Sequence, residues 1–104
     1  MKLNTYERLL LINNLPKTGS FTNLRIVREL LESLSFSEEE HKALGFDQDE
    51  KGLSWNMEAD REVEIEIGDV ARKFVLSSLL DLSEKEQANM ELLAIWEKFG
   101  FTED

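Results

Sequence analysis

The chain has 104 residues, of which 41% are hydrophobic and 33% charged, and its formal net charge is −10. These values are typical of one soluble domain that buries roughly 60–70% of the surface of its unfolded chain. The absence of cysteine excludes disulfides, a thiolate metal site and a thiol nucleophile. No segment resembles a signal peptide or the roughly 20 apolar residues of a membrane span. We therefore expect a single globular domain over residues 1–104, located in the cytoplasm.

Two helices are predicted in the first third of the chain. The first begins after Asn4, a favourable N-cap residue, and Glu7 stands at the capping-box position. It ends before Pro16, because the residue preceding a proline is pushed out of the helical region. Its apolar surface is wide, so we expect this helix to be largely buried. The second covers residues 21–34, where one apolar stripe has helical spacing. The residues of that stripe are Leu24, Val27, Leu30, Leu31 and Leu34.

A short acidic helix is predicted next, over residues 38–44. Ser37 is its expected N-cap, Glu40 completes a capping box, and Gly45 is its expected C-terminal stop. Three helices followed by a hairpin are the order of a winged helix-turn-helix domain. The recognition helix would then open with three carboxylates, which phosphates repel. Lys17, Arg25 and Arg28 make too small a basic face to compensate, so we expect no direct nucleic-acid binding.

Residues 62–67 alternate between glutamate and apolar side chains, which predicts a strand with one buried and one exposed face. From Asp69 the apolar residues take helical spacing instead, which predicts a helix that continues to about Leu82. Residues 53–57 also alternate, and the connection over 58–61 has the length of a hairpin loop. We expect these two strands to pair as a hairpin packed on the helices, because two strands alone are marginally stable.

The last helix is predicted to begin at Ser83, with Glu86 at the capping-box position, and to end at Gly100. Trp55 and Trp96 lie on predicted apolar faces, so we expect both to pack in the core. The predicted fold class is α+β: four main helices plus one short helix packed with a small antiparallel β-hairpin.

Acidic residues concentrate in the middle of the chain. Residues 1–31 hold five Lys/Arg and two Asp/Glu, residues 32–69 hold three and thirteen, and residues 70–104 hold four and seven. Such a field repels nucleic acids and membrane surfaces and favours a partner protein with a basic surface. The glutamates of the predicted strand are solvent-facing, so we expect the fold to tolerate their replacement. The residues expected to face the partner are Glu62, Glu64, Glu66, Asp47, Asp49 and Glu58.

One segment has the spacing of a calcium-binding loop. Asp47, Asp49 and Glu58 stand at its positions 1, 3 and 12, with glycine at position 6. Position 5 should supply an oxygen ligand, but Lys51 stands there and its charge repels a metal ion. We therefore expect an acidic turn in which Gly52 takes a backbone conformation that other residues avoid, and neither a metal nor another cofactor.

The composition also argues against an enzyme. Carboxylates about 6–7 Å apart along one strand face have a spacing that suits an inverting glycosidase. Catalysis would require a pocket that raises the pKa of one of them, and an exposed strand offers none. His41 is the only histidine, and we expect it to be an exposed helix residue. No nucleophile elbow or phosphate-binding glycine loop is present.

The stretch ERLLLINNLPKTGSFTNLRIVRELLESLSFSEEEHKALGF, with the later SWN and EIEIG, resembles a group of short acidic proteins of unknown function from phages and prophages of bacteria. The resemblance implies a setting in the cytoplasm of a bacterial host. Its motifs are packing and capping patterns, so it carries over no functional residues.

The leading hypothesis is a non-enzymatic protein–protein interaction module, a phage accessory protein. The alternatives are a nucleic-acid-mimicking inhibitor of a host DNA- or RNA-binding protein and a phage structural or assembly component. The oligomeric state stays open.

Overall fold

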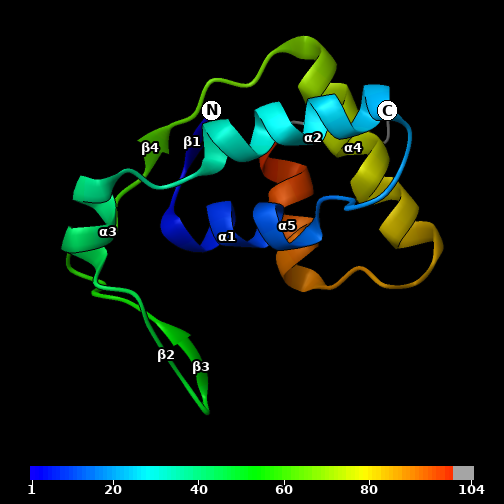
Figure 1. Ribbon diagram of the computed structural model, residues 1–104. Helices are drawn as coiled ribbons and strands as arrows, with labels where there is room; N and C mark the ends of the chain where they lie inside the picture. Colours follow the sequence, from blue (N-terminus) through cyan, green and yellow to red (C-terminus); the bar gives the residue numbers. More distant parts are fainter. Residues whose placement is uncertain (100–104) are drawn as a thin grey trace.

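The computed structural model describes residues 1–99, and within them the fold is α+β, with five helices and two small antiparallel sheets (Figure 1). The predicted fold class is therefore confirmed. The α1, α2, α4 and α5 helices surround one core, while α3 and the β2–β3 hairpin lie to one side. The elements are β1 (Lys2–Leu3), α1 (Thr5–Asn14), α2 (Phe21–Leu34), α3 (Glu38–Leu44), β2 (Asp47–Asp49), β3 (Gly52–Ser54), β4 (Val63–Glu64), α4 (Asp69–Glu84) and α5 (Met90–Lys98).

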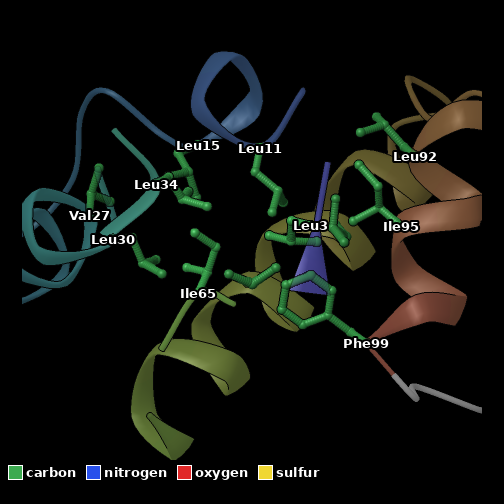
Figure 2. Packing of buried hydrophobic residues seen from close by; sticks show 12 residues of the cluster. Leu3, Leu11, Leu15, Val27, Leu30, Leu34, Ile65, Leu92, Ile95 and Phe99 are labelled. Carbon is green, nitrogen blue, oxygen red and sulfur yellow. The ribbon is translucent and has the colours of Figure 1, made fainter. Parts of the chain in front are cut away.

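The core forms where the apolar stripes of the four larger helices meet. Side chains from β1, α1, α2, α5 and the segment after β4 converge around Leu3, which is completely buried (Figure 2). Each buried Leu, Ile or Val contributes about 1.5–3 kcal/mol relative to an exposed one. The buried cluster is Leu3, Leu11, Leu15, Val27, Leu30, Leu34, Ile65, Val75, Leu79, Leu92, Ile95 and Phe99.

The helix starts follow the capping signals in the sequence. Asn4 Oδ1 accepts a hydrogen bond from the Glu7 backbone N–H at 2.8 Å, and the Glu7 carboxylate accepts one from the Asn4 N–H at 2.9 Å. Ser37 and Glu40 form the same reciprocal pair at the start of α3. That helix ends at Gly45, whose φ of 55° is the left-handed conformation expected for a C-terminal glycine.

Strand pairing differs from the prediction. The β4 strand pairs with β1, with Leu3 opposite Val63 and Lys2 opposite Glu64. The hairpin is formed instead by β2 and β3, so segments 53–57 and 62–67 are not its two strands. Alternation indicates that a segment is extended but does not identify its partner. Residues Lys2–Leu3, far away in sequence, form the strand that pairs with β4. A turn at residues 50–51 joins β2 and β3 into a shorter hairpin.

The boundary between the last two helices also differs. The α4 helix continues to Glu84, so Ser83 lies inside it and does not cap the next helix. Glu86 takes a positive φ of 58°, and Asn89 is the N-cap of α5, accepting a hydrogen bond from the Leu92 N–H at 2.9 Å. The Ser-x-x-Glu pattern was present, but the backbone hydrogen bonds of α4 continue through Ser83 to Lys85, whose N–H donates to the Asp81 carbonyl. The predicted stop at Gly100 lies outside the described residues.

The α1 helix is less enclosed than its apolar composition suggested. Only Thr5, Arg8 and Leu11 are buried, and Tyr6 is exposed. The helix therefore lies across the core with one face partly open. No helix within residues 1–99 combines the length and hydrophobicity that crossing a membrane requires.

Candidate functional site

The β2–β3 hairpin projects from the body of the molecule, and we call residues 47–54 the hairpin arm (Figure 1). Every residue of its two strands is exposed. The strands are joined at Glu50 and Lys51, where Asp49 Oδ1 accepts a hydrogen bond from the Lys51 N–H at 2.8 Å. Gly52 follows with a φ of 119°, as the interpretation of an acidic turn required. The arm therefore presents a well-defined backbone whose side chains face solvent.

A row of aromatic rings fixes the base of the arm to the body. Trp55 follows β3 and stacks on Tyr6 of α1, with ring centroids 6.5 Å apart. On its other side Trp55 meets Phe46 edge-on at 6.0 Å, and Phe46 meets Phe36 at 5.1 Å. Such edge-to-face pairs each contribute about 0.5–1.5 kcal/mol beyond their burial. The expectation that Trp55 packs in the main core is wrong, because it packs in this separate aromatic row; Trp96 packs against the main core.

Asp60 links the aromatic row to the start of α1. Its Oδ2 accepts a hydrogen bond from Trp55 Nε1 at 3.2 Å, and its Oδ1 accepts one from the Thr5 N–H at 3.0 Å. Burial by itself raises the pKa of Asp60. The hydrogen bonds from Thr5 and Trp55 outweigh that effect and hold the pKa below its usual value. Asp60 therefore links Trp55, and with it the base of the arm, to the start of α1.

Arg8 is a buried charge that sequence reasoning missed. Its guanidinium donates to the backbone carbonyls of Leu34 and Ser35 at the end of α2 and to the Glu40 carboxylate of α3. It also lies 3.9 Å from the centre of the Phe36 ring. The hydrogen bonds from Arg8 lower the pKa of Glu40, against the effect of burial. Because the group is enclosed and fully engaged, we assign it to the fold. The signal was an arginine within an otherwise apolar helix.

The six acidic residues predicted to face a partner do not form one free surface. Glu64 accepts a hydrogen bond from the N-terminal ammonium group of Met1 at 2.8 Å. Glu62 forms an ion pair with Lys98 of α5 at 2.8 Å, and Lys98 also binds Glu7. These cations lower the pKa values of both glutamates. Both glutamates therefore join distant segments through exposed ion pairs, and the expectation that the fold tolerates their replacement stays a prediction.

Glu66 and the acidic residues at 47, 49 and 58 are the remaining members of that prediction. All four are exposed: Glu66, Asp47, Asp49 and Glu58. Glu66 makes no ion pair within residues 1–99. Asp47 and Asp49 lie on β2, while the Glu58 N–H donates to Asn56 Oδ1 at 3.1 Å beyond the arm. In the described part of the chain, no three acidic or histidine side chains are close enough to hold a metal ion. Within this segment, residues 47–54 form a hairpin.

A surface of opposite sign lies on α2, and we call it the basic groove. It runs between α2 and the end of α1, and its apolar lining includes Ile12 and Leu24. Lys17 and Arg28 line it as well, and Arg25 and Phe21 extend it toward the start of α2. The Phe21 side chain is 92% exposed. The sequence identified the three cations but gave no reason to place an exposed aromatic ring beside them.

A hollow between α4 and α5 is too small to be a ligand site. Leu80, Leu93 and Trp96 are among its lining residues, and its volume is about 100 Å³. Ligand pockets are typically about 300–1,000 Å³. The hairpin arm and the basic groove each combine charged side chains with an exposed apolar one.

Scans against protein-family models, curated proteins and solved structures find no match to this chain.

Proposed function

We propose that this protein is a non-enzymatic protein–protein interaction module whose hairpin arm docks onto a basic surface of a partner. The observation that supports this most directly is the projection of an acidic hairpin whose strand residues are all exposed. An element that buries so little adds little to the stability of the fold. Its sequence is thus free to serve recognition, as binding loops held by a rigid scaffold commonly do. In this proposal the chain acts in the cytoplasm of a bacterial host as a phage accessory protein.

The chemistry of the arm and the segment just after it suits a basic partner with an apolar centre. Asp47, Asp49 and Glu50 supply three carboxylates against the single cation of Lys51. Leu53, on β3, and Met57, just beyond the arm, are 41% and 68% exposed. Methionine is enriched in the cores of protein interfaces, and charge complementarity speeds association and selects partners. The aromatic row holds the arm in place before binding, which lowers the entropic cost of docking.

The test uses the whole chain as bait in a bacterial lysate, with a variant that reverses charge on the arm. Asp47→Lys with Glu50→Lys reverses two charges and leaves the Asp49 turn contact intact. Glu84→Lys with Glu97→Lys makes the same change in net charge on exposed positions of α4 and α5. The arm variant should bind the captured protein at least tenfold more weakly, the loss of about 1.4 kcal/mol expected for removing close charge pairs. The control should bind normally.

Equal capture by the arm variant and the wild type would contradict the proposal. Thermal unfolding of both variants checks that the fold survives. Duplex DNA should then be added to the complex with the captured partner. Displacement of the protein by DNA identifies the arm as a nucleic-acid mimic, whereas a ternary complex excludes mimicry and leaves an ordinary docking role.

A further inference from the structure

The basic groove has the features of a docking surface, and its lining includes no acidic side chain. Lys17, Arg25 and Arg28 are exposed, and within residues 1–99 none of them forms an ion pair. Glu29 and Glu32 follow the two arginines at i+4, the spacing at which helical ion pairs form, yet no such pair is made. In a chain with 22 acidic and 12 basic residues, these three cations make a local surface of positive charge.

The exposed Phe21 ring makes the groove more than a charged surface. It lies among Leu24, Arg25 and Arg28 at the start of α2. Aromatic and arginine side chains are the residues most enriched among those that dominate binding energy at interfaces. An occupant of this groove must therefore offer carboxylates to the arginines and apolar groups to the ring. Two copies of the groove facing each other would bring arginine against arginine, so a symmetric pairing through this surface is disfavoured.

The chain itself carries an element with the required chemistry. The hairpin arm offers Asp47, Asp49 and Glu50, with the exposed apolar side chains of Leu53 and Met57 beside them. Figure 1 shows that the arm extends away from α2, so a chain does not place its own arm in its own groove. A three-residue strand extends about 10 Å, which lets the tip reach a surface on another molecule.

We propose that the hairpin arm of one copy docks into the basic groove of a second copy, head to tail. This inference rests on the proposed function, because it names the partner of the same arm. An interface between two different surfaces of identical chains forms a ring when its rotation closes and an open chain when it does not. The arm is small, so the association is weak and weakens further with added salt, which screens the carboxylate–arginine attraction.

Sedimentation velocity of the full chain tests the proposal over roughly 10 μM to 1 mM, a range chosen for a small, weak interface. The wild type should associate as its concentration rises. The arm variant, Asp47→Lys with Glu50→Lys, and the groove variant, Arg25→Glu with Arg28→Glu, should each remain monomeric. Mixed in equal amounts, the two should associate again, because each reversed surface then meets a surface of opposite charge. The Glu84→Lys, Glu97→Lys control should behave as the wild type.

A substitution that leaves the charges unchanged gives an independent readout. Phe21→Ala removes the exposed ring and should weaken association about tenfold, as truncation of an interface hot spot does. The inference is overturned if the wild type is monomeric throughout, if association survives either charge reversal, or if mixing fails to restore it. A monomeric wild type whose arm still captures a basic protein would overturn self-association alone. Self-association through the arm, with no other protein captured, would limit the proposed function to this one partner.

Discussion

Replacing Arg8 with methionine should destabilise the fold more than the same change at any exposed arginine. The arginine side chain is 3% exposed and joins α1 to the end of α2 and to α3. Methionine keeps an apolar stem against Phe36 but cannot donate a hydrogen bond. The carbonyls of Leu34 and Ser35 then lose their donor, and Glu40 loses its counter-ion.

The expected loss follows from these contacts. Removing one partner of a buried ion pair costs about 3–5 kcal/mol, and each buried acceptor left without a donor costs about 1–3 kcal/mol. Glu40 keeps 29% of its side chain in contact with solvent, so water compensates part of its loss. We therefore expect the free energy of unfolding to fall by about 3 kcal/mol. For a chain of this length that lowers the melting temperature by roughly 14 °C.

Urea unfolding followed by tryptophan fluorescence measures this loss. Arg25→Met is the matched control on an exposed position, and its effect should stay within about 0.5 kcal/mol. A double-mutant cycle with Glu40→Gln should give a coupling of about 1 kcal/mol or more, since the two side chains are in contact. If Arg8→Met costs less than about 1 kcal/mol, the reasoning that this charge holds three helices together is refuted.

Three further predictions concern pH and the ends of helices. Glu40 and Asp60 have folded pKa values below their unfolded values of about 4. The stability they add is therefore complete above roughly pH 5 and is lost as pH falls through the folded pKa values. Urea unfolding between pH 7 and pH 3 should show this loss, and Glu40→Gln should make the free energy of unfolding depend less on pH. Gly45→Ala forces alanine into a left-handed conformation and should cost roughly 1–2 kcal/mol, read from the urea midpoint; an unchanged midpoint would show that α3 ends differently. Asn89→Ala should lower the free energy of unfolding by about 1 kcal/mol, because it removes the N-cap of α5, while Ser83→Ala should be nearly neutral. The reverse order of the two variants in thermal unfolding would show that the last helix begins at Ser83, as the sequence predicted.

Local signals predicted the helices well because those signals are complete within a few residues. Asn4 with Glu7, and Ser37 with Glu40, satisfy each other's backbone donors without help from the rest of the chain. The left-handed Gly45 is likewise a property of the backbone at one position. Predictions of this kind depend on sterics and hydrogen bonds that a short window contains.

Pairings over long sequence distances could not be predicted in this way. The alternation over 62–67 indicated an extended segment, but its partner, β1, lies about 60 residues earlier in the chain, with three helices and a hairpin between them. The same distance hid the ion pair between Glu62 and Lys98, and with it the role of an apparently free carboxylate. Of the candidate site, the sequence indicated the acidic residues Asp47, Asp49 and Glu58, whereas the hairpin that β2 and β3 form, its projection and the exposed Phe21 emerge only from the packing.

The pairing of β1 with β4 has a consequence for how the chain is made. Leu3 leaves the ribosome sixty residues before Val63, its partner across the sheet. At a synthesis rate of roughly 5–20 residues per second, that interval is about 3–12 s. During this time β1 has no partner strand, and its edge is open to other chains. Nascent-chain chaperones and the speed of translation between these codons should therefore change the yield of folded protein more than differences in its free energy of unfolding do.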